Sequence, residues 1–588
     1  MKSSKRSVNQ VTQRSFLIGL LAGSGSLISA NAHAADYYVA PAGSDSNAGT
    51  LAAPFATLQK GADVAVAGDT VYIRGGTYSI TTPKSAGAGL TFSKSGTSDS
   101  NRIKYWAYQA EVPVFDFTNM VLSTSGYTHG FVVTGSWLHF RGLELRNVPM
   151  NTFSNNAIAA NGGGNCIFEL LNLHHNSGNG IFIGKGTGGN LILNTDAHDN
   201  YDATSNQGDG QNADGIGVHY QTSGASTIVR GCRAWWNSDD GYDLINQEVP
   251  VIIENSWAMG NGYIKSGTAR PADGNGNGFK AGSSKTGVRH VIRGSLAWKN
   301  VAAGFYANHS SGGNDWFNNT SYNNGTQYNM LASDPNDSSV TIVLMGTLVH
   351  KMRNNIGFPN KNTNMNGVDT GFNSWDLMLT PAAADFVSVM DTDALGPRQA
   401  DGSLPNVDFM KLAKGSKMID KGTDVGLPSV GAAPDLGAFE YGAASAGTAG
   451  GTGSAGAASV AGAPGTGVGG NAPVSSAGAG GALGIAGSAE AGGTTHAGGS
   501  QAHAGAPGSS GSTPALAGTG NDGPPRADGD SAGCGCGIPG RSSSVPRPAI
   551  ALASLLGALA LLRQKRRVFE RSDLVTVGSR DNRSSTVR

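Results

Sequence analysis

Asparagines recur at a fixed spacing in the middle of this chain, and the repeat constrains the fold more than any other feature. Each asparagine follows a short apolar–polar run, and the set comprises Asn176, Asn200, Asn237, Asn261, Asn300 and Asn324. The successive gaps are 24, 37, 24, 39 and 24 residues, so a 24-residue unit recurs with two insertions of 13 and 15 residues. A period of this length predicts a solenoid in which each unit contacts its neighbours.

Strand patterns inside the repeat favour an all-β fold, a parallel β-helix. Alternating apolar and polar residues at 227–230, 251–254 and 290–293 each come just before an asparagine-ending run. We therefore expect coils of about two dozen residues with short strands joined by turns. Asparagine tolerates left-handed backbone at a turn, and stacked asparagines would form an internal ladder. A short helix is expected at about 57–65, where it would cap the N-terminal end of the stack.

The N-terminal end and the segment after the repeat do not look like core. Residues 1–34 combine a basic start, an apolar stretch and an Ala32-His33-Ala34 cleavage pattern, which predicts a secretory signal peptide. The β-helix domain is then expected at 35–442. Residues 443–533 are rich in Gly, Ala and Ser and have almost no large apolar residues, so they are predicted to be a disordered spacer.

The C-terminal end carries a second candidate signal at 534–567. A Cys-Gly-Cys motif, a hydrophobic segment at 549–562 and a basic cluster follow one another, and a polar tail at 568–588 comes after them. This order resembles the MYXO-CTERM type of sorting signal, although the tail is a departure from it. The resemblance implies secretion, C-terminal processing and anchoring at the cell surface or outer membrane. A transmembrane anchor is the alternative, and in both cases only this hydrophobic segment is expected to contact a membrane.

Composition and cysteine use restrict the partners. The formal net charge is zero, so no bulk electrostatic argument supports nucleic-acid binding. Cys166 and Cys232 are the two cysteines of the expected domain, and one possible pair is not a disulfide framework. We expect them to be buried thiols, and we expect the domain to be a monomer.

Acidic residues and one lysine gather around the two insertions. They are Asp214, Asp239, Asp240, Asp243 and Lys280. Residues one unit apart lie on adjacent coils, so these side chains are expected to converge on one face. Clustered carboxylates among Gly and Asn suit a hard cation such as Ca²⁺, and a lysine beside that cation can act as a neutral base. The pattern suggests elimination chemistry; solvated turns, or a Ca²⁺ ion that only holds the loops together, are the alternatives.

A family resemblance rests on three segments. They are Asn212-Ala213-Asp214-Gly215, Cys232 through Asp243, and Gly278-Phe279-Lys280. In order and spacing they resemble polysaccharide lyase family nine, the pectate lyases built on a right-handed parallel β-helix, over about 36–439. The chain departs from that pattern at Ile216-Gly217-Val218-His219, where a phenylalanine and a nearby lysine are expected.

The resemblance implies a substrate and a role for each site residue. Asp214, Asp239, Asp240 and Asp243 would bind Ca²⁺, and Lys280 would remove the C5 proton of polygalacturonate, an acidic polysaccharide. The α-1,4 linkage would then break by β-elimination. The departure around His219 concerns substrate contacts more than the metal.

Three other functions stay open on the residues alone. A glycoside hydrolase would use Asp239 and Asp240 as acid and base on water, but the Gly-His-Gly motif of polygalacturonases is absent. A surface adhesin or carbohydrate-binding solenoid fits the spacer and tail equally well. A C5-epimerase would share the proton abstraction. Tryptophans at 235, 236, 257 and 298 suit either sugar stacking or core packing.

Overall fold

The structure is a computed structural model that describes residues 34–205, 208–282 and 286–443. Among these residues no helix has the length and apolar character needed to cross a membrane. The predicted signal peptide, spacer, hydrophobic segment at 549–562 and polar tail lie outside the described residues, apart from Ala34 and Ala443 at their edges.

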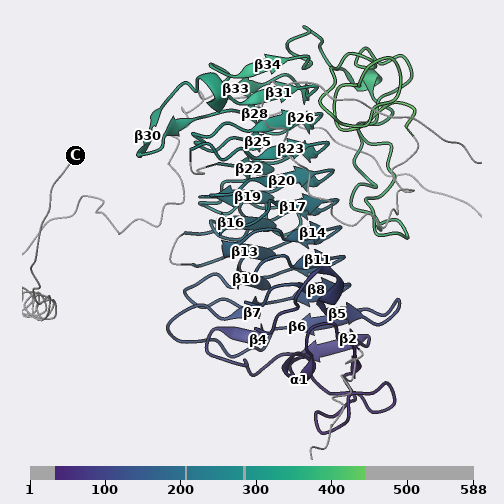
Figure 1. Cartoon of the computed structure of the whole chain (residues 1–588). Helices are drawn as coiled ribbons and strands as arrows, with labels where there is room; N and C mark the ends of the chain where they lie inside the picture. The colour runs from purple at the N-terminus through teal and green to yellow at the C-terminus, as the bar shows by residue number, and fades with distance from the viewer. Residues whose placement is uncertain (1–33, 206–207, 283–285, 444–588) are drawn as a thin grey trace, which may run out of the picture. The chain divides into compact units, whose positions relative to one another are not determined.

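The described chain winds into a parallel β-helix, as the repeat predicted (Figure 1). Sheet A contains β1 (Asp36–Val39), β2 (Thr70–Ile73), β5 (Ile103–Ala107), β8 (Leu138–Arg141), β11 (Ile167–Glu169), β14 (Leu191–Leu193), β17 (Thr227–Arg230), β20 (Val251–Glu254), β23 (Val291–Arg293), β26 (Asp315–Phe317), β31 (Lys351–Arg353) and β34 (Asp369–Gly371). Sheet B contains β3 (Gly76–Ser79), β6 (Pro113–Asp116), β9 (Glu144–Arg146), β12 (Asn172–His174), β15 (Asp196–His198), β18 (Arg233–Trp235), β21 (Trp257–Met259), β24 (Leu296–Trp298), β27 (Thr320–Tyr322) and β32 (Ile356–Phe358). Sheet C contains β4 (Ala88–Phe92), β7 (His129–Val133), β10 (Ile158–Gly162), β13 (Ile181–Thr187), β16 (Ile216–Ser223), β19 (Tyr242–Ile245), β22 (Phe279–Ala281), β25 (Ala303–Tyr306), β28 (Thr326–Asn329) and β33 (Asn362–Thr363).

Few other regular elements interrupt the three sheets. Strands β29 (Ser333–Asp334) and β30 (Asp337–Thr341) form an antiparallel pair. Three short 3₁₀ turns, η1 (Asp99–Asn101), η2 (Gly346–Leu348) and η3 (Ala383–Asp385), lie in connections. Helix α1 (Leu58–Val64) begins after Thr57, whose hydroxyl accepts the Lys60 N–H, and it packs against the first strands as the predicted cap.

The asparagine ladder is confirmed and satisfies buried amides along the stack. Each of the five asparagines from Asn176 to Asn300 donates its Nδ2 to the Oδ1 of the next, up to Asn324, at 2.9–3.0 Å. The chain separations are the same 24, 37, 24, 39 and 24 residues that define the repeat. A buried amide without a partner costs about 1–3 kcal/mol, so the ladder favours one register of the coils.

Along the site strands of sheet C, side chains point alternately into the core and to the outer face. Tyr242, Phe279, Phe305 and Tyr328 point inward and stack at centroid distances of 4.5, 4.9 and 5.1 Å. Because side chains alternate along a strand, the next residues, Asp243, Lys280 and Tyr306, lie on the outer face. Their register is direct, with Asp243 beside Lys280 and Lys280 beside Tyr306.

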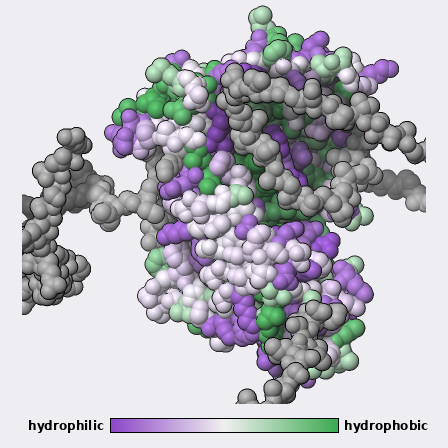
Figure 2. Space-filling view, in the orientation of Figure 1, coloured by the Kyte–Doolittle hydropathy of each residue, from purple (hydrophilic) through white to green (hydrophobic). Residues whose placement is uncertain are grey.

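The C-terminal part of the described chain packs on the outer face of sheet B. Phe386, Phe409 and Met418 join one buried cluster with Trp257 and Trp298. In Figure 2, hydrophobic side chains gather at the upper right, where this segment lies in Figure 1. Trp235, Trp257 and Trp298 are 7%, 3% and 0% exposed, so the core-packing interpretation is correct for them and the sugar-stacking one is wrong. Cys166 and Cys232 are buried free thiols, as predicted.

Candidate active site

The five predicted site residues converge on three consecutive coils. Asp214 comes just before β16, Asp239 and Asp240 come just before β19, Asp243 lies in β19 and Lys280 lies in β22. Figure 1 shows these three strands stacked one above another. All five side chains are buried, with exposed fractions of 4%, 1%, 0%, 2% and 2% in chain order. The solvated-turn interpretation of the aspartates is therefore wrong.

Two of the aspartates belong to a second ladder, at the entrance to sheet C. The side-chain Oδ1 of each member accepts the backbone N–H of the equivalent residue one coil further, through Asn156, Asn179, Asp214, Asp240 and Asn277. Asn277 continues the series to the N–H of Ala303. An aspartate in this position uses one oxygen for the ladder, and its second oxygen contacts a neighbouring side chain, Asn179 for Asp214 and Lys280 for Asp240.

Backbone and amide donors hold the carboxylates in place. Asp239 Oδ1 accepts the Asn275 N–H at 2.7 Å. Asp240 Oδ1 accepts both the backbone N–H and the Nδ2 of Asn277, at 2.7 and 2.9 Å. Asp214 Oδ2 accepts Asn179 Nδ2 at 3.1 Å. These contacts pre-organise the acidic cluster before any ligand arrives.

Lys280 is the cation of the cluster. Its Nζ lies 2.8 Å from Asp240 Oδ2 and 3.5 Å from Asp243 Oδ2. It also donates to Asn275 Oδ1 at 3.3 Å. Because Lys280 is 2% exposed, it is not a solubilising surface lysine.

Burial and the neighbouring charges shift the pKa values of the clustered aspartates. Burial, together with the Asp243 and Asp240 charges, raises the pKa of Asp214 well above its usual range. Burial and the Asp240 charge likewise raise the pKa of Asp239. Burial alone would raise the pKa of Asp243, but Lys280 and His219 hold it below its usual value. Four carboxylates face one ammonium group, so the cluster has an excess of negative potential.

The donor set fits a hard divalent cation. Oxygens of Asp214, Asp239 and Asp240 lie within 4.8 Å of one another and all three residues are buried. Asp243 Oδ1 has no hydrogen-bond partner among the described residues, and Asp240 Oδ2 makes no well-aligned hydrogen bond besides its ion pair with Lys280. Carboxylate oxygens that are buried, close together and incompletely paired suit Ca²⁺.

Sequence reasoning missed several residues of the site. His219 lies on β16 with its Nε2 3.5 Å from Asp243 Oδ2. Its only signal was the departure of 216–219 from the family pattern. Asn179 and Asn277 hydrogen-bond to Asp214 and Asp240 and belong to the same second ladder. Their regular spacing could have identified them, but the sequence analysis followed only the asparagines of the first ladder.

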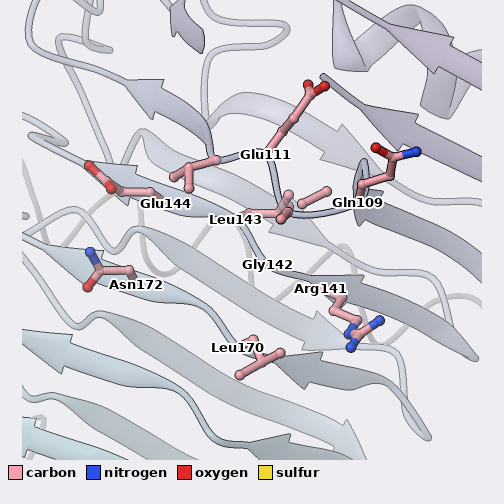
Figure 3. Close-up of a pocket in the computed structure, with 11 residues that line it drawn as sticks. Gln109, Glu111, Arg141, Gly142, Leu143, Glu144, Leu170 and Asn172 are labelled. Atoms are coloured by element: carbon pink, nitrogen blue, oxygen red, sulfur yellow. The ribbon is translucent and has the colours of Figure 1, made fainter. Parts of the chain in front are cut away.

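A pocket elsewhere in the described chain shares no residue with this cluster. Its volume is about 340 Å³, and its walls come from 107–112, 141–144, Leu170 and Asn172, at turns between sheets A and B (Figure 3). Its acidic groups already have partners, since Glu111 pairs with Arg74 and Glu144 pairs with Arg146. The pocket therefore does not compete with the acidic cluster as the reaction site.

Comparisons with known proteins agree on one family. Residues 37–362 match the family described as "Pel9A-like, right handed beta helix region". A pectate lyase L of Dickeya chrysanthemi is 36% identical over 405 residues, which cover 69% of this chain and 90% of the relative. A pectate lyase PEL9 of Emericella nidulans is 30% identical, with 66% and 94% covered.

Two solved structures extend the comparison. A crystal structure of pectate lyase Pel9A is 34% identical with a TM-score of 0.57, and covers 69% of this chain and 96% of its own. A rhamnogalacturonan lyase is 33% identical with a TM-score of 0.57, and covers 64% and 96%. The chain thus belongs to the Pel9A-like family of right-handed parallel β-helix proteins and is a polysaccharide lyase.

Proposed function

We propose that this protein is a Ca²⁺-dependent pectate lyase that cleaves α-1,4-linked polygalacturonate by β-elimination. The observation that carries the proposal is Lys280, held among four buried aspartates with its Nζ 2.8 Å from Asp240 and 3.5 Å from Asp243. A potential base beside a hard-cation cluster is the arrangement that removal of a proton next to a carboxylate requires. The relatives that are named pectate lyases support the substrate.

The four aspartates are proposed to bind the cation. Asp214, Asp239, Asp240 and Asp243 would hold the cation, with the ladder oxygens of Asp214 and Asp240 fixing their orientation. When bound, Ca²⁺ would neutralise the uronate carboxylate, acidify its C5 proton and favour the neutral form of the adjacent lysine.

Lys280 performs the chemical step. Its amine takes the C5 proton, the electron pair forms the C4–C5 double bond, the C4–O bond breaks, and the departing oxygen takes a proton from solvent water. The products are a new reducing end and a 4,5-unsaturated sugar at the new non-reducing end. Asn275, which accepts from Lys280 at 3.3 Å, aims the amine while it is neutral and receives no charge in the reaction.

Hydrolysis is the weaker alternative on this geometry. The carboxylate oxygens of Asp239 and Asp240 lie within 4.8 Å of each other. A glycosidase needs one carboxylic acid to protonate the leaving group and a second carboxylate free to activate water or attack the sugar. Asp240 is moreover engaged by Asn277 and Lys280.

The substrate has one specific rival, the rhamnogalacturonan backbone, because a rhamnogalacturonan lyase structure is 33% identical over nearly its whole length. Both substrates contain a uronate, so the proton abstraction by Lys280 is common to them. Secretion and surface anchoring remain proposals that rest on the two terminal signals.

The test mixes the full-length protein with polygalacturonate or rhamnogalacturonan, in the presence of Ca²⁺ or of a chelator. Ultraviolet absorbance follows the formation of the conjugated unsaturated product. We expect Ca²⁺-dependent absorbance on polygalacturonate, and a loss of about a hundredfold or more in kcat for Lys280→Ala. Lys280→Arg should be similarly inactive because arginine stays charged. Lys351→Ala, an exposed lysine of sheet A, is the matched control. Reducing ends without absorbance would mean hydrolysis, and activity on rhamnogalacturonan alone would reassign the substrate.

A further inference from the structure

His219 places a buried nitrogen at the edge of the acidic cluster. The residue is 9% exposed, and its Nε2 approaches Asp243 Oδ2 at 3.5 Å but makes no well-aligned hydrogen bond with the described residues. Phe182 packs edge-on against the ring at a centroid distance of 5.0 Å, which keeps the imidazole in place. A buried polar atom without a partner costs free energy, so a ligand that uses this nitrogen is favoured.

The nitrogen is aimed at two aspartates. Its Nε2 lies 3.5 Å from Asp243 Oδ2. The donor atoms of Asp214, His219 and Asp243 all lie within 4.8 Å of one another, and all three residues are buried. Asp243 Oδ1 also has no hydrogen-bond partner in the described part of the chain. The imidazole and the Asp243 carboxylate therefore each have an atom without a well-aligned hydrogen bond, and a ligand atom of each lies within 4.8 Å of the other.

We propose that Asp214, His219 and Asp243 form a second metal site, for a divalent transition ion such as Zn²⁺. Imidazole suits Zn²⁺, Co²⁺ and Ni²⁺, whereas Ca²⁺ takes oxygen ligands, so this set and the all-oxygen set differ in preference. Ligand bonds of about 2.0–2.1 Å in a tetrahedral site place donor atoms roughly 3.3 Å apart, close to the His219–Asp243 separation. Water would complete the coordination.

The two proposed metal sites share ligands, so the two kinds of ion would compete for them. Asp214 belongs to both sets, and Asp243 is both a predicted Ca²⁺ ligand and a neighbour of Lys280. A transition ion on His219 would draw both carboxylates away from the hard cation. Binding of the two kinds of ion is therefore antagonistic, and micromolar transition metal should inhibit unless Ca²⁺ is in large excess.

The experiment measures binding without using activity. The metal-stripped full chain, without a histidine tag, is titrated with Co²⁺ by visible d–d absorption, and Ca²⁺ is then added. We expect one equivalent of Co²⁺ that Ca²⁺ displaces. His219→Gln should weaken this equivalent by at least about tenfold. His175→Gln, which changes an exposed histidine on another face, should leave it unchanged. Circular dichroism confirms that each variant is folded.

A second variant keeps the test decisive if His219→Gln does not fold. Asp243→Asn should also lose the Ca²⁺-displaceable Co²⁺, since the amide is a poorer ligand. Retention of that equivalent in a folded His219→Gln, or in Asp243→Asn, would overturn the proposal. The result is separable from the lyase proposal: failure of the ultraviolet assay leaves Co²⁺ binding intact, and failure of Co²⁺ binding leaves Ca²⁺-dependent cleavage intact.

Discussion

Asp214 Oδ1 accepts the backbone N–H of Asp240 at 3.1 Å, one coil further along the stack. Each of these carboxylates therefore takes a place that asparagines occupy in the neighbouring coils, at Asn179 and Asn277. One oxygen continues the ladder, while the other accepts from Asn179 in Asp214 and lies beside Lys280 in Asp240. A carboxylate thus replaces a ladder amide and adds a negative charge at this position while the ladder hydrogen bond is kept.

Replacing Asp240 separates the structural role from the ligand role. Asp240→Asn keeps a ladder oxygen but loses the ion pair with Lys280, so without metal it should be less stable than the wild type and more stable than Asp240→Ala, which loses both contacts. Ca²⁺ affinity should fall at least tenfold. Asp240→Ala should lose affinity and about 1–3 kcal/mol of stability as well, because the Asn277 donors lose their partner. Calorimetry and urea unfolding with a chelator measure both quantities. Equal stability of the two variants would contradict the ladder role.

The raised pKa of Asp239 predicts an unusual dependence of stability on pH. Because burial and Asp240 raise its folded pKa above the unfolded value of about 3.9, its contribution to stability is full below that value and is lost as pH rises through the folded pKa. In chelator, the unfolding free energy of the wild type should therefore fall relative to that of Asp239→Asn as pH increases above about 4. Ca²⁺ should reverse this trend, since it binds the deprotonated acid. Urea unfolding at several pH values tests it, with the exposed Asp408→Asn as control.

Gly217 is predicted to be needed for the position of Asn179. A Cβ at Gly217 would lie 2.5 Å from Asn179 Nδ2, which donates to Asp214. Gly217→Ala should therefore displace the amide and lower Ca²⁺ affinity several-fold, while the fold is kept. Gly357→Ala is the control, because a Cβ on this strand glycine meets nothing closer than 3.6 Å. Unchanged Ca²⁺ affinity in Gly217→Ala would show that Asn179 does not position Asp214.

Tyr306 is predicted to contact the sugar next to the reacting one. It pairs in register with Lys280 on the outer face of sheet C, about 4.8 Å along the stack. Its ring suits stacking on a pyranose, so Tyr306→Ala should raise KM several-fold with little effect on kcat. Tyr306→Phe keeps the ring and should behave like the wild type in steady-state kinetics. If both variants lose the same activity, the hydroxyl group is responsible.

Some elements of the fold were readable because they are periodic in the chain. The gaps between Asn176 and Asn324 became the separations of the ladder hydrogen bonds, and β17 and β20 have the predicted bounds. The packing of the C-terminal segment on the outer face of sheet B was not predicted. It depends on contacts such as that between Arg398 and Asp196, which are 202 residues apart, and no local sequence pattern indicates such a contact.

In the site as well, some residues were identified from the sequence and others only from the structure. Aspartates 214, 239, 240 and 243 and Lys280 were identified by residue type and spacing, and the structure brings them together. His219 was visible only as a departure from a pattern, because its importance comes from the Asp243 oxygen on the next coil.

The sequence by itself determined the repeat, the strands β17 and β20, β23 to within one residue, and the group of acids and one lysine around the two insertions, since a regular period and residue types can be read directly from the chain. Only the tertiary structure decided that Asp214 and Asp240 share an amide ladder, that Lys280 is buried beside Asp240, and that burial raises the pKa of Asp214 well above its usual range. The physical reason is that distances and burial arise when coils stack in one register, and residues 24 to 39 positions apart acquire them only then.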